Sequence, residues 1–381
     1  SATVGSGAID VAVNRATNTI YVANNGGTTV SVINGADNSV AATIDLMLSP
    51  DAIAVNESLN KIYVLHSQAL GKVSIIDGTT NTFTTINVGA KPVALAVNTL
   101  TNKVYVANRD SNNVSVINSA GVETKKIAVG MKPVAVLVNS ELNRIFVANY
   151  DSNTVTAIDG GTDEYAKSSN LDANGAASVG NKPVAMARSQ THRVFVVNSI
   201  GNSLTIIDGV DFSVGAETGI GTAPQSITYN SVNDSIYVGL SATDSNKVIR
   251  ADAGNLNNQT EILVGQNPVK LAADPVSNRL YVACRDNNVV MVVNCKNNSV
   301  INNIPVQQQP VALAVNPVTG RVYIANNGSI DLTVLDMQDE KNVGMTPTPV
   351  LPGAPGTNRI FSSSASVSVT VAGTMATGLP A

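Results

Sequence analysis

Residues 88–98 (VGAKPVALAVN), 102–108 (NKVYVAN) and 113–118 (NVSVIN) decide the fold of this 381-residue chain. Small and large apolar residues alternate along the first segment, where Ala94 and Ala96 are interleaved with Leu95 and Val97. A period of two is typical of β-strands rather than of helices. The run at 109–112 (RDSN) and Asp-Gly pairs such as 77–78 supply residues favoured in tight turns. Each segment therefore predicts a short strand that ends in a turn.

The same pattern returns eight times along the chain. Each copy has an aromatic residue in its second strand, and successive aromatic residues lie 41 to 49 residues apart, at Tyr21, Tyr63, Tyr105, Phe146, Phe195, Tyr237, Tyr281 and Tyr323. Four strands in a repeat of about 42 residues are typical of a β-propeller blade. We predict an all-β, eight-bladed β-propeller with four-stranded antiparallel blades.

The two ends of the repeat region suggest how the ring closes. Residues 3–14 align with residues 87–98, so the chain starts inside an outer strand, and the eighth copy stops after its third strand at 332–336. We predict that residues 1–4 supply the missing outer strand of blade eight, which removes an exposed edge. A seven-bladed ring with one copy outside is the alternative. The long gap between Phe146 and Phe195 indicates an insertion at 161–177, expected as a loop between the third and fourth strands of blade four.

A Pro/Gly-rich tail follows the propeller, which we place at residues 1–339. Residues 342–357 have the composition of an extended linker. Beyond it the alternation is strict, and we expect a single β-strand formed by Ser366, Val367, Ser368, Val369, Thr370 and Val371. Because a lone strand is not stable by itself, this segment of the 340–381 tail should either lie on its own propeller or pair with a neighbouring subunit. We expect pairing with a neighbour, which gives a homo-oligomer or a homopolymer in the form of a filament or surface lattice.

The repeat resembles the YVTN β-propeller family. The resemblance rests on residues 21–24 (YVAN), 105–108 (YVAN) and 323–326 (YIAN), on 114–118 (VSVIN) and on 92–98 (PVALAVN), and it extends over about residues 1–339. It implies exported proteins, including cell-surface and surface-layer-like proteins; some relatives are periplasmic, and one branch is associated with binding of single-stranded DNA. The motif is specific for fold and weak for activity.

Three lysines form the candidate binding site. Lys91, Lys132 and Lys182 each precede the proline that begins an innermost strand, so they are expected at one mouth of the channel in consecutive blades. Three adjacent ammonium groups suit an anion-binding arc; three solvated lysines in similar turns are the alternative.

We expect no catalytic residue, no metal and no cofactor. The two histidines, His66 and His192, are too few for a haem or copper centre, and we expect His66 to be a surface or strand-end imidazole rather than a metal ligand. Cys284 and Cys295 would lie at opposite ends of a hairpin, too far apart for a disulfide.

Composition narrows the function classes further. The net charge of −4 argues against nucleic acid as the main partner, and no apolar stretch is long enough to span a membrane. We therefore expect a non-catalytic, exported structural protein of the cell surface or an extracellular assembly, which self-associates through its C-terminal strand. A periplasmic module that binds an anionic ligand or single-stranded nucleic acid at the channel face is the alternative. A lactonase-like enzyme is a third and less favoured alternative, because it would need clustered carboxylates and a divalent metal at the channel.

Overall fold

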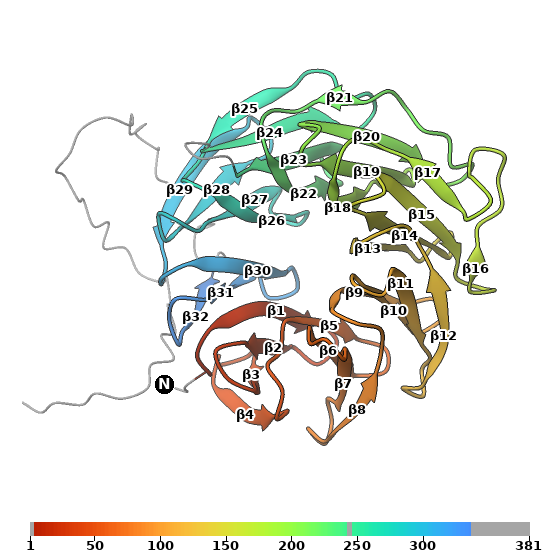
Figure 1. Ribbon diagram of the computed structural model, residues 1–381. Helices are drawn as coiled ribbons and strands as arrows, with labels where there is room; N and C mark the ends of the chain where they lie inside the picture. Colours follow the sequence, from red (N-terminus) through yellow and green to blue (C-terminus); the bar gives the residue numbers. More distant parts are fainter. Residues whose placement is uncertain (1–3, 242–245, 337–381) are drawn as a thin grey trace, which may run out of the picture.

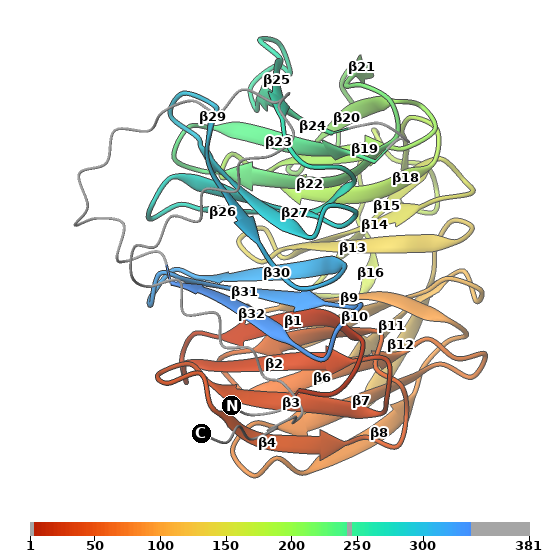
Figure 2. The same ribbon diagram turned by 90° about the vertical axis from the view of Figure 1, so that its left-hand side faces the viewer.

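The computed structural model describes residues 4–241 and 246–336, and these form strands and turns without a helix. The strands make eight antiparallel sheets of consecutive strands, arranged as blades around a central axis (Figure 1). The predicted eight-bladed propeller is confirmed, and the seven-bladed alternative is wrong. The blades are numbered 1 to 8 in chain order, and Figure 2 shows the blades from the side.

Each blade contributes one strand to each of four positions, counted outward from the axis. The innermost strands are β1 (Ala8–Asn14), β5 (Ala52–Asn56), β9 (Pro92–Asn98), β13 (Pro133–Asn139), β18 (Pro183–Arg188), β22 (Pro224–Asn230), β26 (Pro268–Asp274) and β30 (Pro310–Asn316). The second strands are β2 (Thr19–Asn24), β6 (Lys61–His66), β10 (Lys103–Asn108), β14 (Arg144–Asn149), β19 (Arg193–Asn198), β23 (Ser235–Leu240), β27 (Arg279–Cys284) and β31 (Arg321–Asn326).

The third and outermost strands complete the blades. The third strands are β3 (Thr29–Asn34), β7 (Lys72–Asp77), β11 (Asn113–Ile117), β15 (Thr154–Asp159), β20 (Ser203–Asp208), β24 (Lys247–Asp252), β28 (Val289–Asn294) and β32 (Leu332–Asp336). The outermost strands are β4 (Val40–Asp45), β8 (Phe83–Asn87), β12 (Glu123–Ala128), β16 (Glu164–Tyr165) with β17 (Ala176–Ser178), β21 (Thr218–Gly219), β25 (Thr260–Leu263) and β29 (Ser299–Pro305).

Burial explains why the four positions differ in sequence. A second strand such as β10 has a strand on each side and a blade against each face, so five of its six residues are buried and its sequence is almost continuously apolar. An outermost strand such as β12 alternates between exposed and half-buried residues, because it has solvent beside it. The innermost strands face the channel with their free edge, which tolerates the proline that begins six of the eight.

Asparagine side chains tie each blade to the next. The last residue of an innermost strand donates a hydrogen bond to a turn residue with positive φ in the following blade, as in Asn14 Nδ2 to Asn60 Oδ1 at 2.8 Å. We call this series the asparagine ladder; its other rungs are Asn56–Asn102, Asn98–Asn143, Asn139–His192, Asn230–Asn278 and Asn316–Asn18. His192 therefore takes the place of an asparagine in blade 5.

The asparagine that ends most second strands also has a structural role. The amide of Asn108 is buried and donates to Asn113 Oδ1 at 2.7 Å and to Ser115 Oγ at 2.8 Å, within its own blade. The linker to the innermost strand passes directly over it, because a Cβ atom on Gly89 would lie 2.6 Å from the Cβ atom of Asn108. The repeated glycine and asparagine are thus explained by packing alone.

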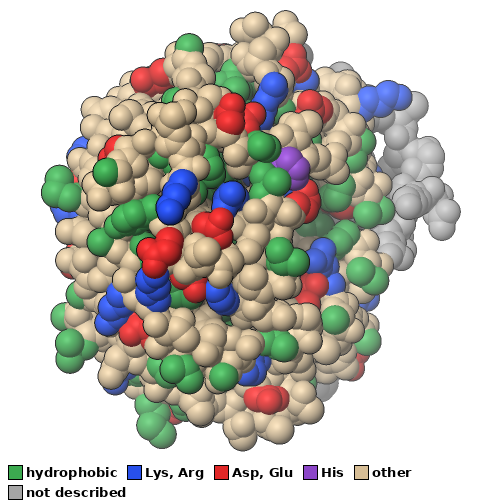
Figure 3. Space-filling view, turned by 90° about the vertical axis from the view of Figure 1, so that its right-hand side faces the viewer, with side chains coloured by type: hydrophobic (Ala, Val, Ile, Leu, Met, Phe, Trp, Pro, Cys, Tyr) green, Lys and Arg blue, Asp and Glu red, His purple; other side chains and the backbone are tan. Residues whose placement is uncertain are grey.

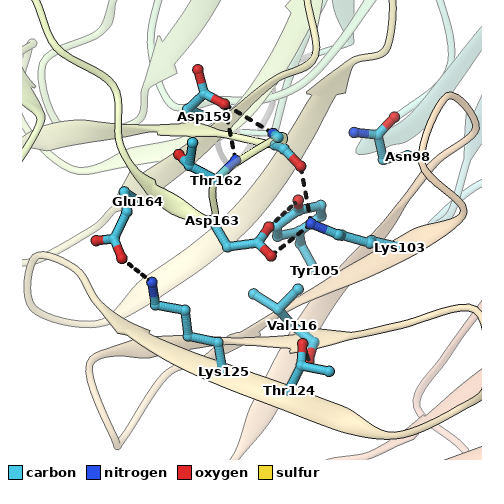
Figure 4. Close-up of polar contacts among 12 residues, drawn as sticks. Asn98, Lys103, Tyr105, Val116, Thr124, Lys125, Asp159, Thr162, Asp163 and Glu164 are labelled. Carbon is cyan, nitrogen blue, oxygen red and sulfur yellow. Dashed lines mark hydrogen bonds and ion pairs between the residues drawn. The ribbon is translucent and has the colours of Figure 1, made fainter.

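Polar contacts around the aromatic residue join blades 3 and 4 (Figure 4). The Tyr105 hydroxyl donates to Asp163 Oδ1 at 2.8 Å, and Lys103 Nζ lies 2.6 Å from Asp163 Oδ2. Lys125 of the outermost strand forms an ion pair with Glu164. The side of the molecule shown in Figure 3 likewise carries basic and acidic side chains next to each other rather than in separate patches.

Blades 4 and 8 differ from the other blades at their outer edges. The insertion in blade 4 does not precede the fourth strand, as expected, but divides it: β16 pairs with one end of β15 and β17 with the other. Blade 8 has three strands among the described residues, and residues 1–3 and the strand expected at 366–371 lie outside them. Val4, the first described residue, is buried in the same apolar cluster as Leu332 and Val334 of blade 8.

Candidate functional site

The three lysines lie on the side of the ring where the innermost strands begin. We call this side, which also carries the hairpins between second and third strands, the entry face. Lys91, Lys132 and Lys182 have φ values of 49°, 50° and 60°, in the left-handed region. This conformation is supported locally, since the Lys132 amide donates to Asn112 Oδ1 and the Lys182 amide to Asn153 Oδ1.

The structure joins two of these lysines through a carboxylate that the sequence analysis did not include. Lys132 Nζ lies 2.7 Å from Asp151 Oδ2, and Lys182 Nζ lies 2.9 Å from Asp151 Oδ1. The Lys182 ammonium also lies 4.8 Å from the centre of the Tyr150 ring. Hydrogen bonds from Lys132 and Lys182 hold the pKa of Asp151 below its ordinary value. The arc is therefore less positive than three free lysines would make it.

A cleft of about 250 Å³ between blades 3 and 4 adds an arginine to this site. It is lined by Arg109, Asp110, Asn112, Met131, Lys132 and Asp151. The Arg109 Nε atom is buried, and among the described residues it has no hydrogen-bond partner. The guanidinium of Arg109 also forms no ion pair with a described residue, so its positive charge is free to attract an anion in this cleft.

The equivalent arginine of blade 7 shows what is unusual about Arg109. Arg285 occupies the same place in its hairpin, and its Nε atom lies 3.2 Å from Asp286 Oδ1. Arg109 is also followed by an aspartate, but the described residues contain no ion pair between them. The sequence of the two hairpins is too similar for this difference to be predicted.

The channel wall carries a second departure from the repeat. Asp10, in the third position of β1, occupies a place where five innermost strands have alanine, and Lys270 stands at the same place in β26. Asp10 Oδ2 accepts a hydrogen bond from the Ile53 amide at 3.0 Å. Burial raises the pKa of Asp10, and the positive charge of Lys270 lowers it by a smaller amount. Asp10 thus places a carboxyl group in the channel wall where most blades have alanine.

His66 lies at the end of β6, as one of the two expectations has it, but it is fully buried there rather than at the surface. Its Nδ1 atom lies 2.9 Å from the Ser49 carbonyl oxygen and its Nε2 atom 2.8 Å from Ser74 Oγ. Burial lowers the pKa of His66. The ring is neutral in this arrangement, with Nδ1 donating and Nε2 accepting, and it replaces the asparagine of the other blades.

The two cysteines and the possible metal ligands form no disulfide or metal-binding cluster among the described residues. Cys284 and Cys295 are buried and free, and burial raises the pKa of the Cys284 thiol to about 12. Within residues 4–241 and 246–336, no three His, Cys, Asp or Glu side chains come together as they would around a metal ion. The same residues include no helix that could cross a lipid bilayer.

Comparison with known proteins supports the fold without giving a family. No protein-family model matches the chain, and a search of curated proteins found no relative. Among solved structures, a chain of Kuenenia stuttgartiensis hydrazine synthase superposes with a TM-score of 0.62 at 16% identity, covering 89% of this chain and 97% of that one. The dihydro-heme d1 dehydrogenase NirN, in complex with DHE, superposes with a TM-score of 0.71 at 12% identity, covering 85% of this chain and 72% of that one.

These neighbours correct one expectation. Both are enzymes by name, so this architecture occurs in enzymes. The expectation that the present chain is not an enzyme rested on its composition and its lack of histidine clusters, and these neighbours contradict it. At such low identity the likeness concerns the fold alone. The resemblance to the YVTN family stays a prediction.

Proposed function

We propose that this propeller binds a small anionic molecule, with carboxylate or phosphate groups, in the cleft of the entry face. The observation that carries the proposal is Arg109, which lines the cleft and whose guanidinium forms no ion pair or hydrogen bond with another described residue. A guanidinium group presents donors in a planar fork that matches the oxygens of a carboxylate or phosphate.

The charge around the cleft supports the same ligand class. Arg109 and the three lysines contribute four positive charges, against two negative charges from Asp110 and Asp151. The excess is local, because the whole chain has a net charge of −4. A cleft of about 250 Å³ favours a small molecule over a long polymer.

The structural neighbours make a ligand on this fold reasonable. NirN, which shares the fold, is described in complex with DHE, so a related architecture holds a bound ligand in that protein.

Isothermal titration with citrate and with pyrophosphate tests the proposal. We expect binding of at least one of them, weakening as sodium chloride is added, and a loss of about tenfold in affinity in Arg109→Gln. Arg285→Gln is the matched control, because it removes the same group from the same hairpin position in blade 7 and should leave binding unchanged.

Two results would overturn the proposal. One is a wild-type protein that binds neither anion at low salt. The other is an equal loss in both arginine variants, which would indicate a general effect of charge rather than a site. Binding of a short oligo(dT) in place of both small anions would favour the single-stranded nucleic acid alternative instead.

A separate proposal concerns the C-terminal segment, which lies outside the described residues. Strict alternation over Ser366–Val371 supports self-association by strand addition, and the YVTN resemblance supports an exported, cell-surface location. Val369→Lys in the full chain should abolish oligomers seen by light scattering, since a charge on the apolar face opposes pairing. Val371→Ile keeps that face apolar and serves as the control.

A further inference from the structure

A cavity of about 310 Å³ opens on the opposite side of the ring, where the innermost strands end. We call this side the exit face. The cavity spans blades 4 to 7, and its lining includes Glu141, Arg188, Gln190, Tyr229, Ser231 and Ala273. Its size is at the lower end of the range of about 300–1,000 Å³ that is usual for ligand pockets.

The lining residues depart from the repeat where other blades follow it. At the position directly before the ladder asparagine or its equivalent, five blades carry valine: Val13, Val55, Val97, Val138 and Val315. The three exceptions are Arg188, Tyr229 and Ala273, in the consecutive blades 5, 6 and 7, and all three line the cavity. Since valine satisfies the fold in five blades, folding alone does not require these three residues.

A smaller residue in the asparagine ladder makes room for the cavity. Ser189 stands in blade 5 where Asn98 and most of its equivalents donate to the following blade. The shorter serine side chain bonds to Thr191 of its own turn instead, at 2.9 Å. Together with alanine in place of valine at 273, this removes side-chain volume at the point where Arg188 and Tyr229 add polar groups.

The charges in the cavity wall are paired. Arg188 Nη2 lies 3.1 Å from Glu141 Oε1, and the ring of His192 approaches the other oxygen of Glu141 at 3.5 Å. The Tyr229 hydroxyl donates to Asp234 Oδ1 at 2.8 Å, which fixes the ring against the cavity. The wall therefore has little excess charge for an ionic ligand to neutralise.

Neutral hydrogen-bonding groups complete the wall. The Gln190 amide and the Ser231 hydroxyl form no side-chain hydrogen bond within the described part of the chain, so both are available to a ligand. Planar donors and acceptors beside one aromatic face suit a molecule with many hydroxyl groups and a few C–H bonds that pack on a ring.

We propose that this cavity binds a neutral sugar of one or two rings, with Tyr229 as the platform and Arg188, Glu141 and Gln190 as its hydrogen-bonding partners. The site is independent of the entry-face cleft and of its anionic ligand. The two sites lie on opposite faces of the ring and share no residue.

Saturation-transfer NMR with a panel of neutral sugars tests this proposal. The panel contains glucose, galactose, mannose, N-acetylglucosamine, maltose, cellobiose and lactose, each at about 10 mM to detect millimolar affinity. We expect transfer to the ring protons of at least one sugar. Tyr229→Val and Arg188→Val restore the residue of the other blades, so both should fold normally and weaken binding about tenfold or more.

The control removes a matching ion pair elsewhere on the exit face. Arg15 Nε lies 2.7 Å from Glu57 Oε1 in blades 1 and 2, away from the cavity, and Arg15→Val should leave sugar binding unchanged. Gln190→Ala, at an exposed position, provides a second test should either valine variant unfold. No transfer to wild-type protein from any sugar, or equal transfer to wild type, Tyr229→Val and Gln190→Ala, would overturn the proposal.

Discussion

The side-chain amide of Asn316 donates a hydrogen bond to Asn18 Oδ1 at 3.0 Å, and so joins the last blade to the first. Innermost strand β30 packs against β1, and Arg321 of blade 8 reaches the Ala36 carbonyl oxygen of blade 1 at 3.2 Å. Every other pair of neighbouring blades is also connected by the polypeptide chain, whereas blades 8 and 1 are held together by these non-covalent contacts. Loss of the rung between Asn316 and Asn18 should therefore loosen this pair of blades more than loss of another rung loosens a pair that the chain also connects.

Asn316→Ala should expose blades 1 and 8 more than the rest of the molecule. Removing one buried hydrogen bond costs about 1 kcal/mol anywhere in the ladder. Hydrogen exchange followed by mass spectrometry should show faster exchange in β1 and β30, because closure there depends on non-covalent contacts. Asn230→Ala removes an internal rung and is the control; uniform changes in both variants would contradict this account.

Tyr105→Phe should destabilise the protein, whereas Tyr63→Phe should not. The Tyr105 hydroxyl donates to Asp163, so its loss should lower the free energy of unfolding by about 1–3 kcal/mol. The Tyr63 hydroxyl is buried without a partner in the described structure, so its removal should be neutral or stabilising. Phe146 and Phe195 already occupy this place in blades 4 and 5. Denaturant titration measures both, and equal losses would count against the assigned hydrogen bond.

His66 should make the protein less stable in mild acid. Burial lowers its pKa in the folded state below the ordinary value of 6.5, so the unfolded chain binds more protons below that pH. Stability therefore falls as the pH drops through about 6.5 toward the folded-state pKa. His66→Asn, which restores the residue of blade 3, should show a smaller decrease in melting temperature between about pH 7.5 and pH 5.5. Identical slopes for the two proteins would show that His66 contributes nothing.

Asp151→Asn should strengthen anion binding at the entry face. The substitution releases Lys132 and Lys182 from their shared carboxylate and raises the local positive charge. We expect affinity for citrate or pyrophosphate to rise about two- to fivefold, with a steeper dependence on salt. Asp286→Asn at the equivalent hairpin of blade 7 is the control. Weaker binding in Asp151→Asn would mean that the carboxylate positions the lysines rather than competing with the ligand.

The sequence predicted the number of blades because that information is local and repeated. Alternation with a period of two specifies strands, turn residues at regular spacing separate them, and eight aromatic residues in the second strands count the copies. The same repetition indicated that Lys91, Lys132 and Lys182 share one face, since equivalent positions in a ring are related by rotation.

Tertiary structure alone decided which side chains meet. Asp151 lies between two lysines that belong to different blades, Arg109 lacks the partner that its equivalent Arg285 has, and the exit-face cavity combines departures from three blades. The burial of His66 was likewise decided by the tertiary structure, because it depends on the neighbouring strands and linker and not on the strand that contains His66. Contacts between blades depend on side-chain volume and rotamer across a packed interface, and a repeat pattern carries no information about these quantities.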